Sequence, residues 1–468
     1  MSDNMSDKNK NKIKIQILNF EKQYLLEELI KIFLQPDQYM LGSPDYKAEP
    51  SEELIVFNRE NFGEKNSISR QIYKTLSSLT GKEPEWGILT GIRPVKLCGE
   101  LYEKLGDTEK TIRFLMKEYL ISEEKARLIM EMYMHQKAFC GPVQKNSAGV
   151  YIGIPFCPTR CVYCSFASNQ VPDSEIAEYF TALLKEVRYV GKRMRQTGIK
   201  AETIYIGGGT PTTLSSEQLD LLIKTVKDCF DLSSLREFTI EAGRPDTITA
   251  EKLSVIRGHG ISRISINPQS MKAETLEKIG RSHQPSDIVD AFALAKKQGF
   301  DNINADIIAG LPGESTEDFV RTLEKVIELD PESITVHCLA VKRASRLIGI
   351  DKDFHYKQAD RVCAQLSESR RILAEAGYIP YYLYRQKHMA GAFENTGYCK
   401  EGKDCIYNVR IMDEHQMMIA LGAGGISKMY YPLENRLERV PNVTNYREYI
   451  NRIDEMMERK EKNIFMEV

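Results

Sequence analysis

Three cysteines lie close together in the stretch VYIGIPFCPTRCVYCSF, residues 150–166. Cys157, Cys161 and Cys164 form the pattern C-x3-C-x2-C. Structural zinc sites use four ligands, and the common ferredoxin patterns also supply a fourth cysteine. Three thiolates on one tight loop instead favour a 4Fe-4S cluster with one open iron that can chelate a small molecule. A zinc site that borrows a distant fourth ligand is the alternative.

A glycine triplet and a strand-end carboxylate form a second group of candidate site residues. Gly207, Gly208 and Gly209 begin GGGTP at the end of the strand-like ETIYIG, whose last residue is Gly207. Glycines let a backbone approach a ligand closely and their amides can form a nest of donors, although many glycine triplets are only turns. Glu241 ends another apolar stretch, where a buried carboxylate needs a hydroxyl or ammonium partner. A solvent-exposed strand end is the alternative for Glu241.

Strands and helices alternate from residue 148 onward. The strands are predicted at 149–154, 202–207, 237–242, 263–268, 302–310 and 333–341. A predicted helix follows each one, and Ser215 with Gln218 forms a capping-box pattern at the start of the second helix. This alternation implies a parallel sheet with right-handed crossovers. Six units predict an α/β fold with a partial (β/α)6 TIM-like barrel.

Barrels of this type carry their chemistry in the loops at the carboxyl ends of the strands. The unusual residues of this sequence fall at those ends, in the order of the strands. They are the cysteines, the glycine triplet, Glu241, Gln269, Asp306 and residues 337–343. We therefore expect residues that are far apart in the sequence to converge on one rim.

Three regions are predicted along the chain. Residues 1–145 form a small α/β domain that begins with the alternating strand KIKIQILNF and includes two helices broken near Ile121. Residues 146–345 form the partial barrel. Residues 346–468 are predicted to be mostly helical, with a loop rich in Tyr and Gly that covers the open mouth of the barrel.

Composition excludes several classes of protein. A formal net charge of -2 provides no field that would recruit nucleic acid or a membrane. No apolar run reaches the roughly 20 residues of a membrane span, and the polar N-terminus lacks the apolar core of a signal peptide. The sequence predicts a cytoplasmic protein, in which the cysteines are thiols or metal ligands and those outside the triad are mostly buried.

The cysteine triad followed by GGGTP closely resembles the signature of the radical S-adenosylmethionine (SAM) superfamily. YIGIPFC, IEA, INPQS, GR at 280–281 and ADIIAGLPGE resemble the oxygen-independent coproporphyrinogen III oxidase (coproporphyrinogen dehydrogenase) family. WGILTGIRPVKL and YRQKHMAGAFENTGY resemble its HemZ-type branch, which extends the resemblance to most of the chain. The barrel is accordingly expected to be of the radical SAM type.

The resemblance implies a particular cofactor arrangement. The triad would hold the 4Fe-4S cluster, whose open iron binds SAM, and one electron from a low-potential donor such as flavodoxin or ferredoxin would split SAM to a 5'-deoxyadenosyl radical. Contacts to this SAM are implied for Tyr151, Gly208, Glu241 and Ile426. Contacts to a second SAM are implied for Tyr163, Gly209, Thr210, Gln269, Arg281, Asp306 and Ala340.

The reaction implied by the resemblance is oxidative decarboxylation of coproporphyrinogen III, a tetrapyrrole, to protoporphyrinogen IX in heme biosynthesis. It requires a basic pocket for propionates rather than an acid–base pair, and arginine suits carboxylates best. Candidates for this pocket, each of which also fits an ordinary surface charge, are Lys342, Arg343, Arg346, Arg385, Lys387 and His388.

Departures from the family pattern leave other functions open. The founding oxidases have a further cysteine two places after the triad, where this chain has Ser165 and Phe166. Relatives without that cysteine resemble heme chaperones, so heme binding and delivery is one alternative, and another radical reaction on a tetrapyrrole is a second.

LGAGGI at 421–426 looks like a dinucleotide loop but follows EHQMMIA, which is predicted to be helical. Cys399 and Cys405 are weak candidates for an auxiliary cluster.

Overall fold

The computed structural model describes residues 12–21, 23–43, 45–46, 54–59, 66–91, 93–340, 345–350, 354, 358–386 and 393–466. The chain divides into two compact units. One comprises Met1–Tyr133, Asp353–Ala359 and Arg385–Phe393, and the other comprises Met134–Lys352, Asp360–Tyr384 and Glu394–Val468. The three regions predicted from the sequence stay a prediction.

The smaller unit is built on a parallel three-stranded sheet in the order β2-β1-β3. The elements up to residue 140 are β1 (Ile13–Leu18), α1 (Gln23–Phe33), β2 (Tyr39–Gly42), β3 (Leu54–Asn58), α2 (Ser67–Thr80), α3 (Pro94–Leu105), α4 (Thr108–Tyr119) and α5 (Glu123–Cys140). Ile15 of β1, Ile30 of α1 and Ile72 of α2 are fully buried in one core. Helix α4 ends at a left-handed Leu120, so the predicted break near Ile121 is confirmed.

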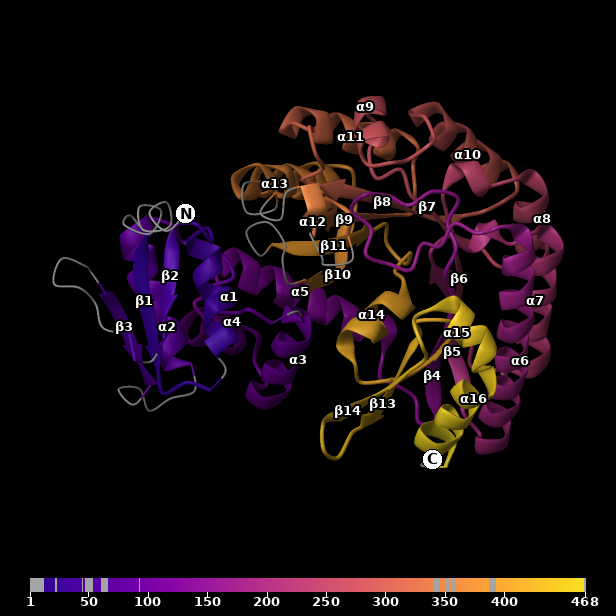
Figure 1. Ribbon diagram of the computed structural model, residues 1–468, viewed down its shortest axis with the longest axis horizontal. Coiled ribbons are helices and arrows are strands. Elements are labelled where there is room, and N and C mark those ends of the chain that lie inside the picture. The colour runs from indigo at the N-terminus through magenta and orange to yellow at the C-terminus, as the bar shows by residue number, and fades with distance from the viewer. Residues whose placement is uncertain are drawn as a thin grey trace, which may run out of the picture. The chain divides into compact units, whose positions relative to one another are not determined.

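The centre of the larger unit consists of six parallel strands that lie in chain order (Figure 1). They are β4 (Ser147–Ile154), β5 (Lys200–Gly208), β6 (Glu237–Gly243), β7 (Arg263–Ile266), β8 (Asn302–Ala309) and β9 (Ser333–Cys338). The helices that follow them are α6 (Asp173–Thr197), α7 (Ser216–Cys229), α8 (Ala250–Gly258), α9 (Ala273–Lys278), α10 (Pro285–Lys297) and α11 (Thr316–Glu328). Each strand matches one predicted from the sequence, so the α/β core of the partial barrel is confirmed.

Five further strands extend this sheet on both sides, in the order β10-β11-β9 at one end and β4-β12-β13-β14 at the other. β12 (Met417–Leu421) is parallel to β4 and antiparallel to β13 (Ile426–Tyr431), which pairs with β14 (Arg436–Pro441). β11 (Glu394–Cys399) is antiparallel to β9 and lies next to β10 (Ile379–Arg385). The other elements are α12 (Leu347–Ile350), α13 (Ala359–Glu375), α14 (Ile406–Asp413), α15 (Tyr446–Asn451), α16 (Ile453–Lys460) and the π-helical turn η7 (Glu461–Phe465). The C-terminal region is therefore richer in strands than predicted.

The helix predicted over EHQMMIA is wrong, because Met417–Leu421 forms strand β12. A short apolar run fits a buried strand as well as a helix, and here the run is buried between β4 and β13. The loop of residues 422–425 consequently follows a parallel strand. A Cβ atom on Gly422 would lie 2.4 Å from the Gly153 carbonyl oxygen, so this loop adjoins the carboxyl end of β4.

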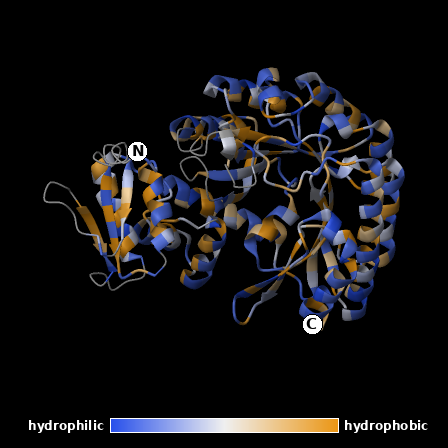
Figure 2. Ribbon diagram, in the orientation of Figure 1, coloured by the Kyte–Doolittle hydropathy of each residue, from blue (hydrophilic) through white to orange (hydrophobic). Residues whose placement is uncertain are grey.

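In the larger unit, hydrophobic residues are concentrated along the central strands, and hydrophilic residues are concentrated on the outer sides of the helices (Figure 2). Helix α6 buries Leu183, Val187 and Val190 completely. The predicted capping box is confirmed at the start of α7, where the Gln218 amide donates to the Ser215 hydroxyl. Within the described ranges, no helix has the length and apolar character needed to cross a membrane.

Candidate cofactor site

The cysteine triad lies on the loop that follows β4. The Cys157 amide donates to the Asn169 carbonyl over 3.1 Å, and the Asn169 amide donates to the Pro155 carbonyl over 2.9 Å, so the two ends of the loop are tied together. In the middle of the loop, the Val162 amide donates to the Ile279 carbonyl over 3.0 Å. These bonds place the loop against the segment that follows α9.

The three cysteine side chains differ in burial. Cys161 is buried, whereas Cys157 and Cys164 are partly exposed. The Thr210 hydroxyl lies 3.4 Å from the Cys157 sulfur, and the Ser168 hydroxyl lies 3.6 Å from the Cys164 sulfur. Burial raises the pKa of the Cys157 thiol, and hydrogen bonds from Thr210 and Ser168 partly offset this effect. Hydroxyl donors of this kind stabilise thiolate sulfur, the form that binds iron.

The sequence leaves two occupants open for this loop, a 4Fe-4S cluster and a zinc ion with a distant fourth ligand. In the described part of the chain, no three His, Cys, Asp or Glu side chains are arranged to hold one ion. Ligands of a multi-iron cluster bind different irons, so they need not converge on one point. Three cysteine sulfurs on one loop match the donor set of the predicted 4Fe-4S cluster, which stays a prediction.

Arg244 holds the cysteine loop and was missed by the sequence analysis. Its guanidinium is buried, chelates the Asp246 carboxylate at 3.0 and 2.8 Å, and donates to the Thr159 hydroxyl at 2.7 Å. It also reaches the Thr159 carbonyl at 3.2 Å and the Ser282 hydroxyl at 3.0 Å. Thr159 lies between the first two cysteines, so Arg244 connects β6 to the middle of the triad. Its position directly after IEAG was the only signal in the sequence.

The glycine triplet packs against the cysteine loop. Gly208 has φ of 117°, and a Cβ atom there would lie 2.9 Å from the Ile154 carbonyl oxygen. A Cβ atom on Gly209 would lie 2.4 Å from the Phe156 carbonyl oxygen and 3.0 Å from the Cys157 sulfur. The amides of Gly208 and Gly209 donate to Glu241 and Ile154 respectively. The glycines thus let the end of β5 pack closely against the backbone of residues 154–156. The amides of Gly208 and Gly209 are already hydrogen-bonded, so they do not form the predicted nest of free donors.

Glu241 lies on β6 and faces β5. The Tyr205 hydroxyl donates to Glu241 Oε1 over 2.5 Å, and the Gly208 amide donates to Oε2 over 3.3 Å. Burial, with the nearby negative charge of Asp306, raises the pKa of the Glu241 carboxyl to about 7. The Glu241 side chain is partly exposed and bonded to Tyr205 and Gly208, which differs from the solvent-exposed strand end considered from the sequence. An ammonium group of a ligand is the kind of partner that would stabilise this carboxylate.

Asp306 lies on β8 between Asn304 and His337. The Asn304 amide group donates to Asp306 Oδ1 over 2.8 Å, and His337 Nε2 lies 3.6 Å from Oδ2. Burial raises the pKa of Asp306, but His337 and the hydrogen bonds lower it overall. Gln269 has a left-handed φ of 64° and donates its amide to the Asp306 carbonyl over 2.9 Å. The structure therefore joins the predicted residues Gln269 and Asp306, and adds His337.

Arg281 and Tyr163 lie beside the buried Cys161. The Arg281 guanidinium donates to the Asn267 carbonyl. Arg281 Nε and Asn267 Oδ1 are both buried, and neither has a hydrogen-bond partner among the described residues. Burial raises the pKa of the Tyr163 hydroxyl despite the neighbouring Arg281 charge. Unsatisfied buried groups are costly, so a bound polar ligand or water is expected to meet them.

Tyrosines line the inner face of the sheet next to Glu241. The Tyr205 ring stacks on Tyr407 of α14 at 4.4 Å between ring centroids, and Tyr151 lies 6.3 Å from each of them. Tyr151 was predicted as a site residue, and Tyr205 stands on the same face as Gly207 because strand side chains alternate. Tyr407 carries no such signal, since α14 lies far along the chain.

Other predicted residues are less firmly joined to the site. Ala340 is partly buried two residues beyond β9, and Ile426 begins β13 directly after the 422–425 loop with 48% of its surface exposed. Arg346 is exposed, and the buried Arg385 donates to the Leu89 carbonyl of the smaller unit. Outside the described residues lie Lys342, Arg343, Lys387 and His388.

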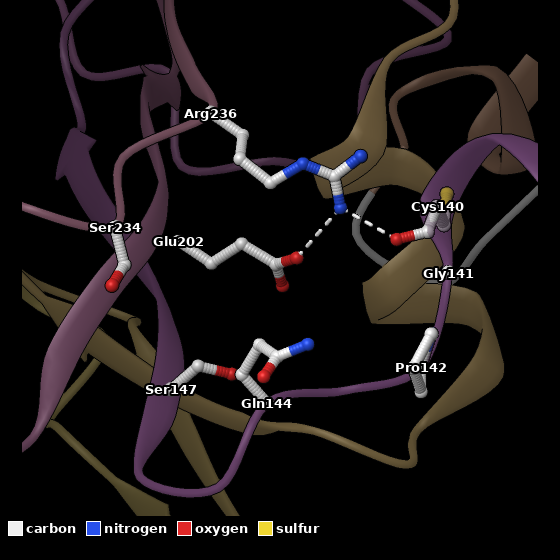
Figure 3. Close-up of a pocket in the computed structure, with 8 residues that line it drawn as sticks. All are labelled: Cys140, Gly141, Pro142, Gln144, Ser147, Glu202, Ser234 and Arg236. Carbon is white, nitrogen blue, oxygen red and sulfur yellow. Dashed lines mark hydrogen bonds and ion pairs between the residues drawn. The ribbon is translucent and has the colours of Figure 1, made fainter.

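Cysteines outside the triad are mostly buried, as predicted. Cys405 donates to Glu237 over 3.1 Å, and burial raises the pKa of both Cys399 and Cys405. A pocket of about 260 Å³ lies near Cys140 at the amino ends of the strands, away from the triad (Figure 3). There Arg236 bonds to Glu202 and to the Cys140 carbonyl, so its polar groups satisfy one another.

Comparison with known proteins agrees with the class that this site defines. Residues 151–326 match the radical SAM superfamily. The fold is similar to that of coproporphyrinogen III oxidase HemN from Escherichia coli, described as a radical SAM enzyme, with a TM-score of 0.53 and 22% identity over 69% of this chain and 73% of that one. The chain is a radical SAM protein, a class that works with an iron–sulfur cluster and SAM.

Sequence comparison identifies the family within this class. The chain is 39% identical over 403 residues to the oxygen-independent coproporphyrinogen-III oxidase-like protein HemZ of Bacillus subtilis, which covers 85% of this chain and 80% of that protein. It is 30% identical over 288 residues to heme chaperone HemW of Escherichia coli, covering 60% of this chain and 70% of that protein. The chain belongs to the oxygen-independent coproporphyrinogen III oxidase family, in its HemZ-type branch.

Proposed function

We propose that the chain catalyses the oxygen-independent oxidative decarboxylation of coproporphyrinogen III to protoporphyrinogen IX in heme biosynthesis. One observation carries the proposal: the glycine triplet contacts both the cysteine loop and Glu241 in a chain of the HemZ-type branch. Cys157, Cys161 and Cys164 would hold a 4Fe-4S cluster. With SAM bound, the reduced cluster supplies the radical that starts the reaction.

The residues of the chain bind and orient the cofactors in this proposal. Glu241 would accept a hydrogen bond from the amino group of the first SAM. Tyr151 would provide a flat apolar surface beside this ligand. Gly208 lets this ligand approach the backbone of β5, and Ile426 covers it from the 422–425 side. A second SAM would contact the residues for which the family resemblance implies this role; they are Tyr163, Gly209, Thr210, Gln269, Arg281, Asp306 and Ala340.

The substrate requirements follow from the chemistry of the propionates. Two propionate groups each lose a hydrogen atom, carbon dioxide and one further electron, and each becomes a vinyl group. The reaction therefore needs a low-potential donor such as flavodoxin or ferredoxin, and a separate acceptor for the electrons released. It needs no general acid–base pair.

An anaerobic turnover assay tests the proposal. Reconstituted protein is mixed with coproporphyrinogen III, SAM, reductant and an electron acceptor, and mass spectrometry follows the loss of two carbon dioxide molecules. Conversion to protoporphyrinogen IX with release of 5'-deoxyadenosine is the expected result. Cleavage of SAM with unchanged coproporphyrinogen would refute the proposed substrate while leaving the cofactor site in place.

Heme delivery is a second candidate, and Phe166 is the observation that favours it. Its side chain is 67% exposed beside the triad, where the founding oxidases have a further cysteine. A flat apolar ring at this position suits contact with a porphyrin. Titration with heme separates the two functions, since a chaperone gives a Soret band with tight stoichiometric binding. S-adenosylhomocysteine among the turnover products would instead indicate heme opening with methyl transfer.

A further inference from the structure

A fully buried ion pair joins the C-terminal helix α16 to helix α6. Lys460 Nζ lies 2.8 Å from Glu186 Oε1, and both side chains have no exposed surface. Burying two charges is costly, and well-packed apolar residues often stabilise a fold as well as a buried ion pair does. The pair therefore calls for an explanation in terms of position rather than stability.

The network around this pair ends on the 422–425 loop. The Gly422 amide donates to Glu186 Oε2 over 2.8 Å, and the Asn442 side-chain amide donates to the Gly422 carbonyl over 2.9 Å. Asn442 also donates to Glu186 over 3.0 Å and accepts from Lys460 over 2.6 Å. Tyr449 of α15 adds a bond of 2.6 Å to Glu186. Both backbone groups of Gly422 are thus held by residues outside its loop.

A second set of contacts connects the same helices to the cysteine loop. The Tyr179 hydroxyl of α6 donates to the Gly153 carbonyl at the end of β4 over 2.7 Å and accepts from the Ala423 amide over 3.0 Å. Phe156, the residue before Cys157, packs edge-on against Tyr179 at 5.1 Å and against Tyr446 of α15 at 5.4 Å. Figure 1 shows α15 and α16, in yellow, beside α6.

We propose that Lys460 and Glu186 are positioning residues that fix the 422–425 loop against the end of β4, in the conformation that receives SAM beside the triad. Gly422, Gly424 and Gly425 have no side chains with which to anchor this loop. Glycine-rich backbone is also the most expensive to order, so a preformed loop needs external bonds. The C-terminal helices are therefore part of the frame of the SAM site. This inference rests on the proposed cofactor site.

A pair of double variants tests whether Lys460 and Glu186 position the 422–425 loop. Glu186→Gln with Lys460→Met removes both buried charges and keeps an acceptor for the Gly422 amide. Lys185→Met with Asp454→Asn is the matched control, because it removes an exposed ion pair of 2.6 Å between the same two helices, with side chains 50% and 78% exposed. Amide exchange over residues 418–428 is measured in the cluster-free protein. SAM affinity and the change that SAM makes in the electron paramagnetic resonance spectrum are measured with the reconstituted cluster.

The buried variant is expected to speed amide exchange over residues 418–428 and to weaken SAM binding about tenfold, which corresponds to about 1.4 kcal/mol. The SAM-induced spectral change is expected to diminish in parallel, and the control to match the wild type. Wild-type exchange and SAM affinity in the buried variant would overturn the inference. If that variant does not fold, Tyr449→Phe replaces it, because this change removes the hydrogen bond from the Tyr449 hydroxyl to Glu186. Wild-type amide exchange and SAM affinity in Tyr449→Phe would then overturn the inference. Failure of wild-type protein to bind SAM would refute the cofactor site, whereas exchange still reports on the loop.

Discussion

Replacement of Glu241 by glutamine is expected to change stability and cofactor binding in opposite directions. Burial raises the pKa of this carboxyl from 4.5 to about 7. The folded state therefore binds the proton more tightly than the unfolded state, and the wild type loses stability as pH rises from 4.5 towards 7. A shift of this size corresponds to about 3 kcal/mol above pH 7, since one pKa unit is about 1.4 kcal/mol.

The glutamine variant lacks this cost because its side chain does not ionise. In the cluster-free protein we expect Glu241→Gln to be more stable than the wild type at pH 8, by up to about 3 kcal/mol, and to gain nothing at pH 4. SAM binding is expected to weaken about tenfold to a hundredfold, since a bond to a charged group contributes about 1.5–3 kcal/mol. Glu251→Gln, on the exposed surface of α8, is the control.

Denaturant unfolding at both pH values and calorimetric SAM titration measure these effects. Wild-type SAM binding near pH 7 should also release protons, which is detected by repeating the titration in buffers of different ionisation enthalpy. If Glu241→Gln changed the free energy of unfolding equally at pH 4 and pH 8, ionisation of Glu241 would not destabilise the folded wild type. Unchanged SAM affinity in Glu241→Gln would refute its role as the partner of the amino group.

The same contacts lead to three further predictions. Cys161→Ala is expected to lose the 4Fe-4S spectrum and the bound iron, and retention of both would show that the ligands are assigned wrongly. Arg244→Gln breaks the bonds to Thr159, so the cluster should be lost to a chelator several-fold faster than in the wild type, with Arg244→Lys intermediate. Tyr205→Phe removes a bond that lowers the pKa of Glu241, so the pH at which SAM binding reaches half its maximum should move upward. An unmoved pH profile would contradict the assignment of that proton to Glu241.

The fold was predictable where the sequence repeats one local pattern. Each central strand is an apolar run, and some of the helices that follow begin at a cap signal such as Ser215, so local interactions determine the unit. β12 escaped prediction because MMIAL is short and apolar, and its identity as a strand depends on pairing with β4 from far along the chain. β11 likewise pairs with β9 from far along the chain, whereas β13 and β14 form a local hairpin that the sequence analysis missed.

Site residues could be predicted where an unusual residue type or spacing stands out in the sequence. Site residues of common types, whose role depends on tertiary contacts, were not predicted. Cysteines at tight spacing, three glycines after a strand and a carboxylate in an apolar strand each stand out in the sequence. Arg244, Tyr407 and Lys460 do not, since a charged or aromatic residue is ordinary on a helix or in a loop. Their importance arises from burial beside Thr159, Tyr205 and Glu186, which only the tertiary structure reveals.

Three glutamates of the larger unit, Glu186, Glu202 and Glu241, differ in the partners that the fold gives them. Burial raises the pKa of each, but Lys460 lowers that of Glu186 overall, and Arg410 lowers that of Glu202 overall. Glu241 bonds only to a phenol and a backbone amide in the described structure, and its pKa stays raised. Where the fold supplies a cation the carboxylate is satisfied and serves as a brace. Glu241 has a phenol and a backbone amide in place of such a cation and contacts the glycine triplet, so we expect the cation of a ligand to bind there.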